Sequence, residues 1–145
     1  MRTFFVVVMS AFIFVCTCSS SFADLKESGE VHFEWQGNPA FGELLLPWPS
    51  DADRNFAFQK AGHALAFFVF ACGLLQILPY RYAAVLSILY AFATEILQLY
   101  FTRSGRLLDV WVDCAGIAIA LILFLVIKNF TRRHVHKDSA SFHRT

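Results

Sequence analysis

Four long apolar runs constrain this chain more than any other feature of its sequence. They cover roughly residues 4–18, 61–78, 82–101 and 107–127. A helix needs about 20 apolar residues to cross the hydrocarbon core of a bilayer, and the last three runs reach that length. Strand-like alternation is absent from these runs, so we expect helices, since lipid permits only helices or closed barrels.

The composition excludes a soluble domain of this length. Hydrophobic residues make up 57% of the 145 residues and charged residues 16%, whereas about 25% are charged in a typical soluble domain. A small soluble domain could not bury this many apolar side chains, because much of its surface stays in water. We therefore predict an all-α integral membrane bundle of four transmembrane helices, with short turns and one outer loop. An ordinary cytosolic enzyme is excluded, and the net charge of +1 gives no reason to expect nucleic acid as a partner.

The first apolar run has two interpretations. Arg2 before it and Ser21-Phe22-Ala23 after it resemble a secretory signal peptide with a small-x-small cleavage site. The same run could remain as a membrane helix, which we favour because it is at the long end for a signal core. Residues 1–23 are thus the first transmembrane helix or a signal sequence, and removal of a signal would leave three spanning helices. In both cases Asp24 emerges outside.

The charges of the loops orient the chain. Residues 24–57 carry seven acidic and two basic residues, whereas residues 128–145 carry five basic and one acidic. Cytoplasmic segments of membrane proteins are enriched in Lys and Arg. We therefore expect residues 24–57 to form an acidic extracytoplasmic loop, and residues 129–145 to form a basic cytoplasmic tail of a multi-pass protein.

Polar residues within the apolar runs are the candidate functional site. Lys60 and His63, and likewise Glu95 and Gln98, are three residues apart, while Asp109 and Asp113 are four apart, so each pair shares a helix face. At ~1.5 Å rise per residue all of them lie in the outer half of the membrane. Ionisable groups at such depth are costly, and they are candidates for function by default. We expect one outward-facing zone formed by Lys60, His63, Glu95, Gln98, Asp109 and Asp113, and covered by Arg103 and Arg106.

A purely structural role for these residues is the alternative. Three cations and three carboxylates could neutralise one another in an ion-pair network that only fixes helix packing, although such networks are weak evidence for stability. Gly116 and Ala120 continue the stripe of Asp109 and Asp113 in a pattern of small residues that lets helices approach closely. The face of Gly116 and Ala120 is also a possible surface for a homo-oligomer.

The order and spacing of these polar residues resemble the VanZ-like membrane proteins. The matching pattern is Lys60-x-x-His63, then Glu95-x-x-Gln98, then Arg103, then Asp109-x-x-x-Asp113-x-x-Gly116, within roughly residues 59–125. The resemblance implies a VanZ-like three-helix membrane core over residues 58–128, in the cytoplasmic (inner) membrane of a bacterium. The founding member is associated with resistance to the glycopeptide teicoplanin, and many relatives have no assigned activity.

Three positions depart from the family pattern. Gln59 stands where the family usually has Asp, Phe67 where it usually has an aromatic hydroxyl, and Asp113 where it usually has Asn. One negative charge is thus lost at Gln59 and one is gained at Asp113.

Two function classes follow from the polar zone. The first is a binding protein for a membrane lipid headgroup, a cell-wall precursor or a glycopeptide-like ligand, held by Lys60, His63, Glu95, Gln98, Arg103, Asp109 and Asp113. The second is a membrane-embedded enzyme acting on an envelope lipid, with His63 and Glu95 as catalytic candidates. Because no Ser or Cys nucleophile accompanies these two residues, hydrolysis would require an activated water. Transport is the least supported class, since inverted repeats are not apparent.

The same polar residues include possible metal ligands. His63, Glu95, Asp109 and Asp113 offer one nitrogen and three oxygen donors, which is acceptable for a divalent ion. We expect neither a metal nor a cofactor, because Lys60 would compete for the same carboxylates, Arg103 would do likewise, and no short His or Cys ligand motif is present.

Overall fold

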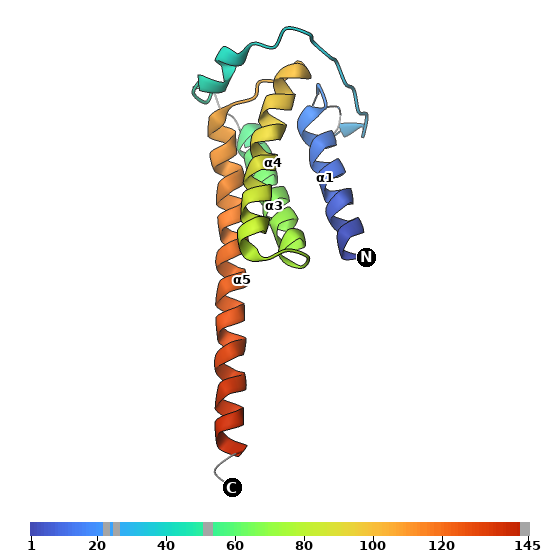
Figure 1. Cartoon of the computed structure of the whole chain (residues 1–145). Coiled ribbons are helices and arrows are strands. Elements are labelled where there is room, and N and C mark those ends of the chain that lie inside the picture. Colours follow the sequence, from blue (N-terminus) through green and yellow to red (C-terminus); the bar gives the residue numbers. More distant parts are fainter. Residues whose placement is uncertain (22–23, 25–26, 51–53, 143–145) are drawn as a thin grey trace.

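The chain folds into a bundle of helices (Figure 1). The structure is a computed structural model of all 145 residues, described here for residues 1–21, 24, 27–50 and 54–142, with side chains as far as residue 132. The elements are α1 (Arg2–Cys18), the 3-10 helix η1 (Phe41–Leu45), α3 (Arg54–Leu75), α4 (Tyr80–Tyr100) and α5 (Leu107–Phe142). No strand occurs among the described residues. The predicted all-α membrane bundle is therefore confirmed.

Three helices are long and apolar enough to cross a membrane. They are α3, α4 and the part of α5 from Leu107 to Arg132, whereas α1 has only 17 residues. Their outward faces carry large exposed apolar side chains, such as Leu65 on α3, Leu89 on α4 and Ile122 on α5. Soluble monomers rarely expose such continuous apolar surface, so these faces are suited to lipid. Whether α1 crosses the membrane or is a signal sequence stays a prediction.

Turns between the helices follow from local sequence. Pro79 precedes α4 as its N-cap, where the absence of a backbone N–H leaves no helical hydrogen bond unmade. At the other end of α4, Phe101 N–H donates to the carbonyls of Leu97 and Gln98, and Thr102 then takes a positive φ of 55°. These two tight turns keep α3, α4 and α5 side by side (Figure 1).

Helices α3 and α5 approach each other closely at Gly116. A Cβ at Gly116 would lie 2.0 Å from the Ala64 carbonyl oxygen, so only glycine lets the two helices meet there. Ala120, one turn further along α5, is also fully buried within the chain. The small-residue face of Gly116 and Ala120 is thus used inside this chain, and a homo-oligomer through that face stays a prediction.

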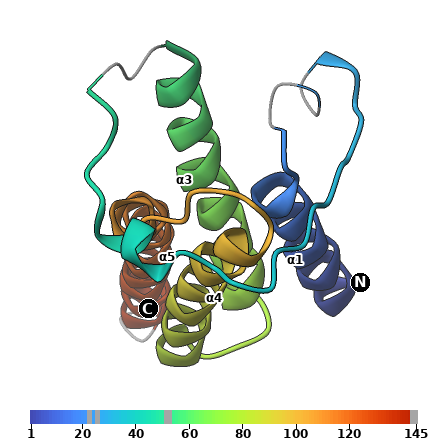
Figure 2. The same cartoon turned by 90° about the horizontal axis from the view of Figure 1, so that it is seen from above.

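Helix α1 packs against both α3 and α4, on the side of the bundle away from α5 (Figure 2). Ile13 is buried in the shared core, and the Tyr90 hydroxyl on α4 donates to the Ser10 carbonyl of α1 at 2.6 Å. The contacts of α1 make it the outer wall of the cavity described below.

The segment of residues 33–50, between α1 and α3, lies across one end of the bundle, with η1 over the start of α5 (Figure 2). Its Gln36 N–H donates to the Tyr100 carbonyl at 2.8 Å, which satisfies an end group of α4. Trp35 stacks on Tyr100 with ring centroids 5.1 Å apart, and Phe33 lies against Phe101 at 5.7 Å. These contacts fix the segment over the end of the bundle at which the polar residues gather.

Candidate functional site

Lys60 and Asp109 form an ion pair between α3 and α5. The Lys60 Nζ lies 2.5 Å from Asp109 Oδ2, and the Trp48 indole N–H donates to Asp109 Oδ1 at 3.1 Å. Asp109 is 2% exposed, so its charge is almost fully desolvated. A buried carboxylate requires such partners, because the desolvation penalty is otherwise not offset. The pair ties the outer loop, α3 and α5 together at one point.

His63 faces Asp113 one helical turn deeper. The His63 Nδ1 lies 3.4 Å from Asp113 Oδ1, but their alignment is not that of a hydrogen bond. Asp113 is 0% exposed, and neither of its carboxylate oxygens has a hydrogen-bond partner among the described residues. Buried carboxylate oxygens are nearly always hydrogen-bonded in folded proteins, so this residue is an exception that requires an explanation.

Glu95, on α4, lies near His63 and Asp113, and hydrogen bonds from two neighbouring residues hold its carboxylate. Gln98 Nε2 donates to Glu95 Oε1 at 2.7 Å, and the backbone N–H of Arg106 donates to Glu95 Oε2 at 2.8 Å. A Cβ at Gly105 would lie 2.1 Å from the Glu95 carbonyl oxygen, so glycine is required for the loop to pass this close. The Gln98 side chain and the backbone of the loop at Arg106 thus hold the two oxygens of Glu95 in place.

His63, Glu95 and Asp113 each offer a donor atom, and these three atoms lie within 4.8 Å of one another. We call these three residues the buried cluster. The cluster draws one residue from each of the three long helices, α3, α4 and α5. Its two carboxylates are separate from the Lys60–Asp109 pair, so Lys60 does not neutralise them by direct contact.

The two arginines of the outer turn do not pair with these carboxylates. Arg103 Nη1 donates to the Ser19 carbonyl at 2.7 Å, just beyond the end of α1, and burial lowers the pKa of Arg103. Arg106 contacts Glu95 only through its backbone N–H. In the part of the chain that the structure describes, no ion pair joins either guanidinium to a carboxylate of the site.

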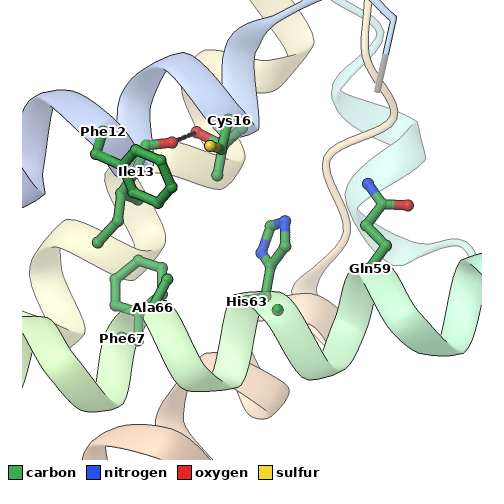
Figure 3. A pocket seen from close by; sticks show the side chains of 9 residues that line it. Phe12, Ile13, Cys16, Gln59, His63, Ala66 and Phe67 are labelled. Carbon is green, nitrogen blue, oxygen red and sulfur yellow. Dashed lines mark hydrogen bonds between the residues drawn. The ribbon is translucent and has the colours of Figure 1, made fainter. Parts of the chain in front are cut away.

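An apolar cavity lies between α1 and α3, beside the buried cluster (Figure 3). It has a volume of about 190 Å³. Phe12, Ile13 and Cys16 of α1 face it from one side, and His63, Ala66 and Phe67 of α3 line the other. Gln59, Gly62 and Thr17 complete its wall. His63 therefore belongs both to an apolar cavity and to a buried charged cluster.

A second hollow, here called the outer hollow, opens at the end of the bundle where the turn between α4 and α5 lies. Its volume is about 440 Å³, and it is lined by Gln36, Glu43, Thr102, Arg103 and Ser104. Its lining is polar, in contrast to the cavity beside His63. Arg103 therefore lies at the outer surface of the site and not within the buried cluster.

The structure brings together most of the residues singled out in the sequence, in two groups: the Lys60–Asp109 pair, and the buried cluster with Gln98. Lys60 pairs with Asp109, His63 lies against Asp113, and Gln98 supports Glu95, whereas Arg103 lies at the outer hollow. Sequence reasoning missed Trp48, the partner of Asp109, because no spacing links a loop residue to a helix so distant in the chain. It also missed Cys16 and Thr17, although their place one turn beyond the buried Ile13 marks the inward face of α1.

Comparison with known proteins agrees with this architecture. The family described as VanZ/LLP1 matches residues 3–128, a range that runs from the start of α1 through α3 and α4 and into α5. A protein named "Uncharacterized membrane protein YwnJ" from Bacillus subtilis (strain 168) is 37% identical over 119 residues. That match covers 81% of this chain and 85% of the relative. No solved structure matches the chain.

Proposed function

Because this chain belongs to the VanZ/LLP1 family of multi-pass membrane proteins, we propose that it binds an envelope lipid at the buried cluster, with an acyl chain in the α1–α3 cavity. A lipid-linked cell-wall precursor falls within this class. A glycopeptide-like ligand is the alternative. It has no acyl chain for the α1–α3 cavity, so it would bind in the outer hollow. The main support for the proposal is that His63 both lines the apolar cavity and belongs to the buried cluster.

The cavity and the cluster have separate parts in recognition. Binding sites for small molecules are mostly apolar, with a few polar groups that fix the orientation of the ligand. An acyl chain gains little by moving from lipid into an apolar cavity, since both surroundings are equally apolar. Selectivity would therefore come from His63, Glu95 and Asp113, which contact the headgroup.

The remaining polar residues support or extend this site. Gln98 holds Glu95, and the Lys60–Asp109 pair fixes α3 against α5. Arg103 lies at the polar outer hollow, where a guanidinium can form paired hydrogen bonds with a phosphate or a carboxylate. We assign Arg103 to the outer part of a headgroup and the buried cluster to its inner part.

The proposal places the site on the outer side of a bacterial cytoplasmic membrane. Its support is the charge distribution, with an acidic segment at residues 24–57 and a basic tail at residues 128–145. Reporter fusions to the carboxyl terminus test this orientation. We expect active β-galactosidase and inactive alkaline phosphatase, and the reverse result would contradict it.

We further propose that α1 stays attached as part of the site. Its Ile13 and Cys16 line the α1–α3 cavity, and the carbonyls of Ser10 and Ser19 accept hydrogen bonds from α4 and the outer turn. An intact mass of the purified protein that includes residues 1–23 is expected. A mass that lacks these residues would contradict this part of the proposal.

Lipid retention tests the binding proposal directly. Gly62 lines the cavity, and nothing lies within 4 Å of a Cβ placed there, so Gly62→Leu fills the cavity without a clash at Cβ. The matched control is Ala61→Leu, which adds similar bulk at an exposed neighbouring position outside the cavity wall. Each protein is purified in detergent, and co-purifying lipids are identified by mass spectrometry.

We expect one lipid class to be retained by the wild type and by Ala61→Leu, and to be lost from Gly62→Leu. Equal retention by all three proteins would contradict the proposal. Absence of a retained lipid from the wild type would also contradict it. A water-soluble glycopeptide that binds Gly62→Leu as well as the wild type would favour a ligand held in the outer hollow.

The contact between His63 and Asp113 supports a second candidate function. An imidazole 3.4 Å from a buried carboxylate needs only a small realignment to become a general base hydrogen-bonded to the residue that orients it. The protein would then be an enzyme that activates water for attack on a bound lipid, with Glu95 nearby. Purified protein in vesicles of its native lipids should generate a lipid product that is absent with His63→Gln. Equal product with both proteins, or none with either, would remove this candidate.

A further inference from the structure

The buried cluster has the donors of a metal site, and among the described residues no Lys or Arg side chain contacts its two carboxylates. Lys60 is engaged by Asp109 at 2.5 Å, and Arg103 is engaged by the Ser19 carbonyl at 2.7 Å. The sequence led us to expect that Lys60 and Arg103 would compete with a metal ion for the carboxylates. Neither side chain contacts Glu95 or Asp113 in the structure, so this competition is absent there. A positive charge beside two buried carboxylates would offset part of their desolvation and of their mutual repulsion.

We infer that His63, Glu95 and Asp113 bind one divalent transition-metal cation with the ligand preferences of Zn²⁺. Imidazole and carboxylate are both good ligands for this ion, whereas Mg²⁺ and Ca²⁺ prefer oxygen alone. Zinc with three protein ligands keeps a further position open for water or substrate. A divalent ion would also balance the two carboxylate charges.

The distances fit such an ion after small side-chain movements. Ligands about 2.0–2.2 Å from a tetrahedral ion lie about 3.3–3.6 Å from one another. His63 Nδ1 and Asp113 Oδ1 are already 3.4 Å apart, and all three donor atoms lie within 4.8 Å. The widest of these separations exceeds the tetrahedral value by up to about 1.2–1.5 Å, which rotation of the side chains, that of Glu95 included, would close on binding.

An independent observation points to a ligand at this place. Asp113 is 0% exposed, and both of its carboxylate oxygens, together with His63 Nδ1, have no hydrogen-bond partner among the described residues. Ligating groups need free lone pairs, which the oxygens of an ionised Asp113 have, and which His63 Nδ1 has when the ring proton is on Nε2. Glu95, in contrast, is held by Gln98 and by the Arg106 N–H, as metal-bound carboxylates commonly are by their outer partners.

His63 also lines the α1–α3 cavity, so the open position of the ion could face that cavity. An anionic lipid headgroup could then bind to the ion directly. This last step depends on the proposed lipid binding, whereas the metal site itself does not.

Zinc content tests the inference with the full-length protein. It is purified through a tag without histidine, and His134, His136 and His143 are replaced by Gln so that the tail cannot bind the ion. The protein is incubated with Zn²⁺ alone and desalted, and the metal is counted by mass spectrometry. We expect one zinc ion per chain, with a Kd raised at least 10-fold by Asp113→Asn and by His63→Gln.

His32→Gln is the matched control, since His32 also lies beside a carboxylate, that of Glu30 at 3.2 Å, but is exposed. This variant should bind zinc as tightly as its parent. A parent protein that binds less than about 0.1 zinc ion per chain would overturn the inference. An Asp113→Asn variant that binds zinc as its parent does would overturn it as well.

X-ray absorption of the zinc-loaded parent gives a test that needs no variant to fold. A first shell of nitrogen and oxygen at about 2.0–2.2 Å, including imidazole, supports the inference. A sulfur shell at about 2.3 Å would overturn it, because zinc would then be held by a cysteine such as Cys16. The zinc assay needs no lipid, and the Gly62→Leu assay needs no zinc, so either proposal can fail without the other.

Discussion

The contact of Gly116 with Ala64 allows a prediction in which two similar substitutions have opposite effects. Gly116→Ala places a methyl group 2.0 Å from the Ala64 carbonyl oxygen, whereas ordinary contact begins at 3.4 Å. The helices must therefore separate locally by about 1.4 Å. Gly62→Ala, on α3, places the same group where nothing lies within 4 Å.

The expected free energies differ in sign. Inserting bulk into a closely packed interior costs about 1–3 kcal/mol. Replacing a glycine within a helix by alanine contributes about 0.5–1 kcal/mol of stability at either position. Gly116→Ala should thus lower the free energy of unfolding by about 1–2 kcal/mol, while Gly62→Ala should raise it by up to about 1 kcal/mol.

Thermal unfolding of the purified proteins in one detergent measures both effects. The separation of α3 from α5 should also move His63 away from Asp113, so Gly116→Ala should bind zinc more weakly, whereas Gly62→Ala should bind it as the wild type does. A Gly116→Ala variant as stable as Gly62→Ala would refute the close crossing of these helices and the geometry built on it.

Three further predictions concern the groups that surround the buried cluster. Lys60→Met should destabilise the protein by about 3–5 kcal/mol in detergent unfolding, because Asp109 keeps a buried charge without its partner, and adding Asp109→Leu should restore most of the loss. Trp48→Phe should cost about 1 kcal/mol in the same measurement through loss of the indole hydrogen bond, and no change would show that this bond contributes nothing. Gly105→Ala should displace the outer turn from Glu95 and lower the unfolding free energy by about 1–3 kcal/mol, and wild-type stability would contradict the 2.1 Å approach.

The spans and the shared helix faces could be predicted from the sequence. Apolar runs of spanning length determine the helices, because lipid leaves the backbone no other way to satisfy its hydrogen bonds. The spacing of Asp109 and Asp113 places both on one face of α5, and the structure has both buried against α3. Periodicity gives the face of each helix, and the cost of an intramembrane charge indicates that these faces meet.

The partner of each charge could not be predicted from the sequence. The sequence offers three cations and three carboxylates, which can pair in several ways. Of the possible ion pairs between them, only that of Lys60 with Asp109 occurs among the described residues. Arg103 lies against the backbone at Ser19 because a half-buried guanidinium needs acceptors, and any carbonyl within reach can provide one. Pairings of this kind depend on side-chain positions that spacing along a helix does not define.

The role of the outer segment and of α1 was also beyond sequence reasoning. Trp48 and Gln36 reach the bundle across more than 60 residues of sequence, to Asp109 and to the end of α4 respectively. The cavity beside His63 exists only because α1 packs beside α3, and α1 by itself is an apolar run that also fits a signal sequence. Contacts between segments so far apart require the tertiary structure.

A density map of the protein in a bilayer nanodisc, resolved well enough to show lipid chains, would test lipid binding at the buried cluster most directly. We expect His63, Glu95 and Asp113 to converge, and elongated density in the α1–α3 cavity to end in a headgroup at His63. Side chains that point apart, or lipid density that lies only on the outer faces of the helices, would contradict it.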